Sequence, residues 1–149
     1  MGYRSDVRII TTGEGWKELK TFTEKYVKYM TDIETNIFKD AYLDYFKTTE
    51  DGEIVYLGWN DIKWVEHDDF YDVDGVMKGL RKLERLDIPF RYARIGEDYS
   101  DYDEDYHTNE NDILPNTALI REFDDQWVVD EMQVVYDMSM KAKQKGAAL

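Results

Sequence analysis

The chain contains no cysteine, only two prolines and nine glycines, and no long apolar run. Without cysteine it can have no disulfide scaffold, thiolate catalysis, iron–sulfur cluster or zinc site with cysteine ligands. A membrane-spanning helix needs about 20 consecutive apolar residues, so the sequence predicts none. The first ten residues lack the basic-then-apolar pattern of a signal peptide. We therefore expect a cytoplasmic protein that has no contact with a membrane.

Basic residues are also scarce relative to acidic ones. The 149 residues include 19 Lys and Arg against 33 Asp and Glu, which gives a formal net charge of −14. Direct nucleic-acid binding is disfavoured, because it relies on clustered Lys and Arg that release counterions from the phosphates. Hydrophobic residues make up 42% of the chain and aromatic residues 15%, which indicates a folded core. We expect a single domain over residues 1–149, without a cofactor, that binds proteins and is not an enzyme.

Hydrophobic periodicity indicates a mixed α+β fold. Strands are predicted at 4–12, 43–48, 54–59, 90–95 and 117–123, and helices at 16–33, 73–86 and 124–140. Asp51-Gly52 is typical of a hairpin turn between the second and third strands. Residues 127–140 also fit a strand, although a helix fits better, and residues 141–149 are predicted to be a frayed tail. This order predicts a ferredoxin-like split βαβ (βαββαβ) core with an extra C-terminal strand and helix.

The predicted core joins one face of the first two helices to one face of the sheet. Its helix residues are Trp16, Leu19, Phe22, Tyr26, Val76, Leu80 and Leu83, and its strand residues are Val7, Ile9, Val55, Leu57, Tyr92 and Ile95. The second helix is expected to be capped by Asp72 or Asp74, because carboxylates are favoured at helix N-termini.

Residues 97–116 differ in kind from the rest of the chain. The stretch 97–112 holds eight carboxylates and no Lys or Arg, which predicts a solvated surface loop. Counted from Asp101, the sixth and twelfth positions of an EF-hand loop are Tyr106 and Asp112, where that motif requires Gly and Glu. We therefore expect no metal site here.

Candidate catalytic residues are poorly supported. The histidines, His67 and His107, show no metal-binding spacing, and no serine lies in a G-x-S-x-G motif. The Gly13-Glu14-Gly15 stretch follows a predicted strand, but Glu14 would repel a phosphate, so a turn and helix start is the better interpretation. The sequence predicts no catalytic residue.

Tyrosines among the carboxylates are the candidate binding residues. Tyr and Trp are enriched at the binding hot spots of protein interfaces, and surrounding charge favours a partner of opposite charge. We expect a partner with a basic surface to be bound by Asp98, Tyr99, Asp101, Tyr102, Asp103, Glu104, Asp105 and Tyr106.

Three stretches carry a resemblance: Met1–Val7 (MGYRSDV), Trp59–Trp64 (WNDIKW) and Arg94–Asp98 (RIGED). They resemble small acidic, uncharacterised bacteriophage proteins with an M-G-Y-R-S-[DE]-V start, a W-x-x-[IV]-K-W segment and an R-I-G-E-D strand end. The resemblance implies a phage accessory protein in the bacterial cytoplasm, and no catalytic residue carries over.

We therefore expect a non-enzymatic protein that binds and inhibits a host defence or DNA-handling factor. Imitation of DNA by an array of carboxylates is one mechanism for this. A metal-dependent hydrolase or nuclease using residues 97–112 and a phage structural or assembly protein are the alternatives. A homodimer is left open.

Overall fold

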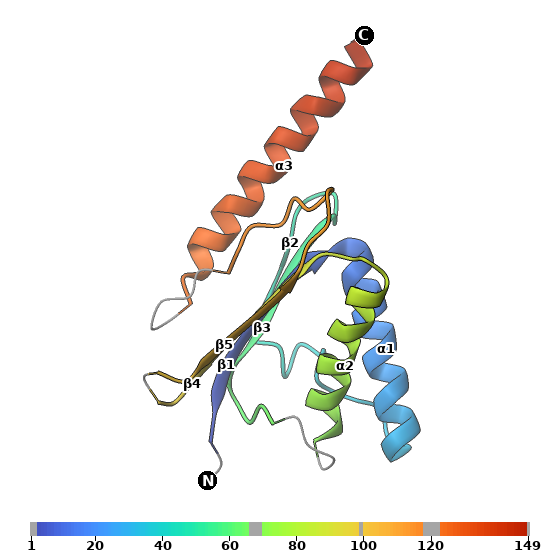
Figure 1. Cartoon of the computed structure of the whole chain (residues 1–149), viewed down its shortest axis with the longest axis vertical. Helices are drawn as coiled ribbons and strands as arrows, with labels where there is room; N and C mark the ends of the chain where they lie inside the picture. Colours follow the sequence, from blue (N-terminus) through green and yellow to red (C-terminus); the bar gives the residue numbers. More distant parts are fainter. Residues whose placement is uncertain (1–2, 66–69, 99, 118–122, 149) are drawn as a thin grey trace.

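The computed structural model describes residues 3–65, 70–98, 100–117 and 123–148. In this part of the chain a five-stranded antiparallel sheet has the strand order β2-β3-β1-β4-β5. The strands are β1 (Ser5–Thr12), β2 (Tyr45–Thr48), β3 (Ile54–Ile62), β4 (Phe90–Gly96) and β5 (Tyr102–His107). The helices are α1 (Gly13–Thr31), α2 (Tyr71–Arg85) and α3 (Asp125–Ala148). Helices α1 and α2 lie on one face of the sheet, whereas α3 begins at the other face and extends past the β2–β3 hairpin (Figure 1).

Local chemistry explains where the elements begin and end. The Thr12 hydroxyl accepts a hydrogen bond from the Gly15 amide at 2.9 Å and so caps the N-terminus of α1. The predicted hairpin is confirmed, and Gly52 adopts the positive φ of 73° that its turn requires. The predicted cap of α2 is wrong, because the helix begins after Phe70 without a side-chain cap. Asp72 instead accepts a hydrogen bond from Thr35, and Asp74 accepts one from Tyr26.

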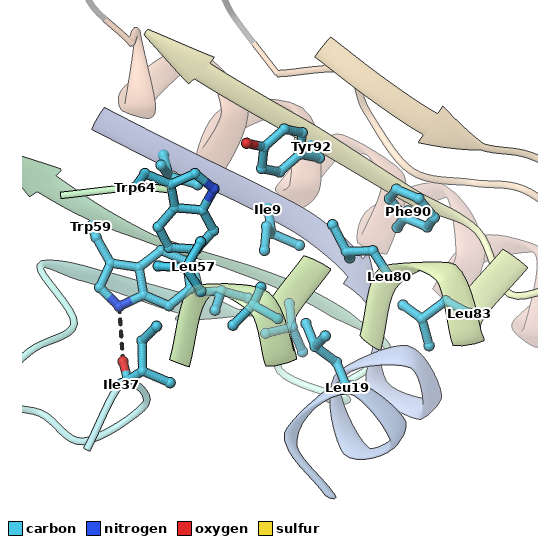
Figure 2. Packing of buried hydrophobic residues seen from close by; sticks show 14 of the residues in the cluster. Ile9, Leu19, Ile37, Leu57, Trp59, Trp64, Leu80, Leu83, Phe90 and Tyr92 are labelled. Atoms are coloured by element: carbon cyan, nitrogen blue, oxygen red, sulfur yellow. Dashed lines mark hydrogen bonds between the residues drawn. The ribbon is translucent and has the colours of Figure 1, made fainter. Parts of the chain in front are cut away.

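The main core lies between the sheet and helices α1 and α2 (Figure 2). The Trp59 indole donates to the Ile37 carbonyl at 2.8 Å, which lets a large polar-tipped ring be fully buried. Most of the predicted core is confirmed, but Trp16, Phe22 and Tyr26 are only half-buried. Ile95 is buried on the opposite face of the sheet from Tyr92, because side chains alternate along a strand.

A second, smaller core holds α3 against the other face of the sheet. It consists of Ile10, Ile54, Tyr56, Leu114, Val128 and Met132. The helix predicted in the C-terminal part is therefore confirmed, and the strand alternative is wrong. The helix continues to Ala148 through most of the segment predicted to be frayed, with Lys145 in its last turn, where a cation favours the helix dipole.

The additional strand of the sheet lies within the acidic segment, as β5. The prediction of a solvated loop is therefore wrong for residues 102–107. A strand was predicted at 117–123 instead, and residues 118–122 of that prediction lie outside the described part of the chain.

Candidate functional site

Strand β5 forms one edge of the sheet and pairs antiparallel with β4 without a bulge. Tyr92 of the main core lies opposite Asp105, so alternate residues of β5 face α1 and α2: Asp103, Asp105 and His107. The intervening residues, Tyr102, Glu104 and Tyr106, lie on the opposite face. The six residues of β5 (YDEDYH) thus contribute to two different surfaces, one on each face of the sheet.

On the helix-facing side, Arg94 forms ion pairs with two of the predicted binding carboxylates. Its Nη2 lies 2.6 Å from Asp101 Oδ1 and 2.7 Å from Asp103 Oδ2. The hydrogen bond from Arg94, followed by one from Tyr3, lowers the pKa of Asp101. The same carboxylates raise the pKa of Arg94, chiefly through the hydrogen bond to Asp101. Asp101 is therefore held ionised by groups within the protein, and Asp103 contacts the same guanidinium.

Three further acidic residues in or near this segment also have internal partners. Asp105 is paired with Arg81 of α2, and His107 Nε2 lies 2.7 Å from Asp87 Oδ1. Beyond the strand, Asp112 lies 2.8 Å from Arg91 of β4. The segment contains no Lys or Arg of its own, but arginines from β4 and α2 supply the opposite charge. This compensation explains why a segment so rich in carboxylates packs as a strand.

The turn that precedes β5 is fixed by Gly96 and Tyr3. A Cβ atom on Gly96 would lie 2.1 Å from Asp101 Oδ2, so no larger residue fits unless Asp101 moves. The Tyr3 hydroxyl donates to Asp101 and accepts from the Asp98 amide at 2.9 Å. Asp98 itself is exposed. Tyr3 and Arg94 belong to two of the three stretches that carry the resemblance, and both contact Asp101.

The opposite face of β5 carries the groups that are free to meet a partner. Tyr102 is 59% exposed and Tyr106 65% exposed, and the exposed Glu104 lies between them along the strand. Of the eight predicted binding residues, Tyr99 lies outside the described residues, and Asp101, Asp103 and Asp105 belong to internal ion pairs. The structure therefore brings Tyr102, Glu104 and Tyr106 together as one exposed row.

A buried charge cluster that sequence reasoning missed connects α3 to the sheet. The Arg8 guanidinium donates to Asp125 Oδ1 at 2.9 Å and Oδ2 at 3.1 Å, and Tyr56 Oη donates to Asp125 Oδ1 at 2.6 Å. Burial and the hydrogen bond to Asp125 raise the pKa of Tyr56. A Cβ atom on Gly58 would lie 2.4 Å from Arg8 Cδ, so glycine provides the space for the arginine. The cluster has a structural role, since all its groups are paired.

Cation sites and membrane spans were also sought in the described ranges. Among these residues no group of three or more His, Asp and Glu could hold a metal ion. None of the described helices combines the length and the apolar composition that a membrane span requires. His67, one of the two histidines, lies outside the described ranges.

Comparison with known proteins identifies no relative. No family model, no curated protein and no solved structure matches the chain. The residues of β5 and its neighbours are therefore the basis on which a function can be assigned.

Proposed function

We propose that this chain is a phage accessory protein that acts in the bacterial cytoplasm by binding a host protein with a basic surface. The observation that carries the proposal is the exposed row Tyr102, Glu104 and Tyr106 on a regular strand. Two tyrosines on an ordered backbone offer apolar area at a low cost in conformational entropy, and the carboxylate between them favours a cationic partner.

We further propose a ferredoxin-like core for residues 5–96, with β5 and α3 as additions. The strand order β2-β3-β1-β4 and the placement of α1 and α2 on one face support this. This architecture hosts many unrelated activities, so it carries no argument about function.

Inhibition of a host defence or DNA-handling factor is the biological role that we propose for the binding. Arg94 and Arg81 offset much of the negative charge on the helix-facing side of β5. Imitation of DNA would therefore depend on carboxylates outside these ion pairs, such as Asp98 and Glu104. If DNA fails to compete for the captured partner, recognition is of the ordinary protein–protein kind.

The hydrolase alternative receives less support from the same geometry. A hard cation needs several free carboxylate oxygens, whereas Asp101, Asp103 and Asp105 each direct at least one oxygen at an arginine. A phage structural role would appear as a large assembly on a sizing column.

The test is capture from bacterial lysate by three tagged versions of the full chain. The first is the unmodified protein, and the second carries Tyr102→Ala and Tyr106→Ala. The third, a matched control, carries Tyr29→Ala and Tyr42→Ala, which removes tyrosines that are 87% and 55% exposed outside β5. We expect one host protein to be retained by the first and third versions and lost by the second. Equal retention by all three would overturn the proposal.

A further inference from the structure

The outer edge of β5 has a definite hydrogen-bonding pattern. The Gly96 amide donates to the Asp101 carbonyl at 2.8 Å, where the β4–β5 pair begins. Hydrogen-bonded and non-hydrogen-bonded pairs alternate along antiparallel strands, so residues 103, 105 and 107 direct their backbone groups at β4. The backbone N–H and C=O groups of Tyr102, Glu104 and Tyr106 therefore point away from the sheet. The Tyr106 amide agrees with this, since it donates to Asp105 Oδ1 at 2.8 Å and not to β4.

We propose that this edge accepts an extended basic segment of the partner as an additional strand next to β5. Addition of a strand to an exposed sheet edge is a common mode of peptide recognition, in which backbone hydrogen bonds give affinity and side chains give specificity. The inference rests on the proposed function and names its mode of binding. The three residues that expose their side chains also direct their backbone groups outward, although the Tyr106 amide already donates to Asp105 Oδ1.

Charge defines the chemistry of the added segment. On the exposed face, a Lys or Arg next to Glu104 would lie between Tyr102 and Tyr106, with its aliphatic stem against the rings and its charge at the carboxylate. On the helix-facing side, Asp103 is 60% exposed despite its pairing with Arg94, so it can accept a second cation. Basic residues at alternate positions of an extended segment therefore match the edge.

A second copy of this chain fits the edge poorly. Antiparallel pairing of β5 with itself about Glu104 would place Glu104 opposite Glu104 and Asp103 opposite Asp105. Shifting the centre of the pairing by one residue, to Asp105, would place Asp105 opposite Asp105. Like charges directly opposite each other destabilise a strand pair, and a charged edge is a known protection against self-association. The occupant is therefore a segment of a different, basic protein.

The probe that tests this is a synthetic peptide of alternating lysine and valine, Ac-KVKVKVK-NH₂, added to the full-length protein. If the peptide adds as a strand, hydrogen exchange should slow at the outward amides of Tyr102 and Glu104. Exchange at Asp103 and Asp105 should not change, because those amides already face β4. Unchanged exchange at Tyr102 and Glu104 under saturating peptide would overturn the proposal. The peptide Ac-EVEVEVE-NH₂ is the charge control and should not slow exchange.

A pair of variants separates backbone pairing from side-chain contact. Glu104→Pro removes an outward N–H that β4 does not use, which an edge strand can tolerate, and Glu104→Gln removes the charge alone. We expect Glu104→Pro to bind the lysine–valine peptide about fivefold to tenfold more weakly than Glu104→Gln does, as loss of a backbone hydrogen bond implies. Equal affinities for two folded variants would contradict strand addition. If Glu104→Pro does not fold, the exchange measurement on the unmodified protein decides.

The two proposals fail in different ways. Strand addition is wrong and the proposed function stands if host capture depends on Tyr102 and Tyr106 while exchange at the outward amides is unaffected. If capture does not depend on the tyrosines, the proposed function is wrong whatever the peptide does.

Discussion

Replacement of Asp125 by alanine tests the role assigned to the buried charge cluster. The Arg8 side chain is only 3% exposed, and Asp125 is its one charged hydrogen-bond partner among the described residues. Without that carboxylate the guanidinium keeps only neutral acceptors, among them Asn60 Oδ1 at 2.8 Å. Removing one member of a buried ion pair typically costs about 3–5 kcal/mol, because the remaining charge stays desolvated. The Tyr56 hydroxyl would lose its acceptor at the same time.

The loss of stability in Asp125→Ala should appear first as release of α3 from the sheet. Besides the ion pair, the helix is held mainly by Val128 and Met132, which are both buried. Each of these contributes about 1.5–3 kcal/mol by apolar burial, so the loss of the ion pair is comparable with the burial of these two side chains together. We therefore expect Asp125→Ala to detach α3 while the sheet remains folded. Detachment of the helix limits the loss of stability that the substitution can cause.

The assay is residue-resolved hydrogen exchange together with urea unfolding. In Asp125→Ala, amides in the first half of α3 should lose protection while those of β1 and β4 keep it. Asp130→Ala is the control, since Asp130 is an exposed residue of the same helix that accepts a hydrogen bond from Gln126. Its effect on the free energy of unfolding should stay within about 0.5 kcal/mol. A loss below about 1 kcal/mol for Asp125→Ala would refute the reasoning.

Three further predictions concern the core and the acidic segment. Leu80→Ala should lower the free energy of unfolding by about 2–5 kcal/mol in urea titrations, because Leu80 is fully buried, whereas the exposed Leu86→Ala should change it little. Because Arg94 and Tyr3 lower the pKa of Asp101 from its usual value of about 4, this carboxylate stabilises the fold above that pH, and its contribution is lost as the pH falls through the lowered value. Asp101→Asn should therefore be less stable at neutral pH and lose less stability on acidification; parallel pH profiles of the urea midpoint would be the contrary result. Calcium or magnesium should leave the melting temperature unchanged, and a saturable rise at micromolar ion would instead indicate a cation site.

The spacing of apolar residues along the chain predicted the helices and strands that bury one face. Four of the strands and all three helices were found near their predicted positions, since an apolar face must be buried wherever it occurs. The alternation of Tyr102, Glu104 and Tyr106 with two aspartates was present in the sequence but was masked by the density of charge. Its compensation comes from arginines 9 and 24 positions away, which no local pattern reveals.

The charge clusters were not predictable for the same reason. Arg8 occupies an ordinary alternating position of a strand, and its partner Asp125 lies 117 residues further along the chain. Asp74 is a residue type that commonly caps helices, yet its carboxylate binds Tyr26 and Lys78. These two contacts lower the pKa of Asp74, although burial acts in the opposite direction. In both cases the fold decides the role of the residue.

The most direct test of the central claim is the rate at which the captured partner associates with this protein as salt is raised. If β5 recognises a basic surface, the association rate constant should fall with salt, since exposed charges are screened beyond about 8 Å at physiological ionic strength. Glu104→Lys should slow association and flatten the salt dependence. Glu24→Lys, an equivalent reversal at an exposed position of α1, should behave like the unmodified protein. Identical rates and salt slopes for all three proteins would contradict the account.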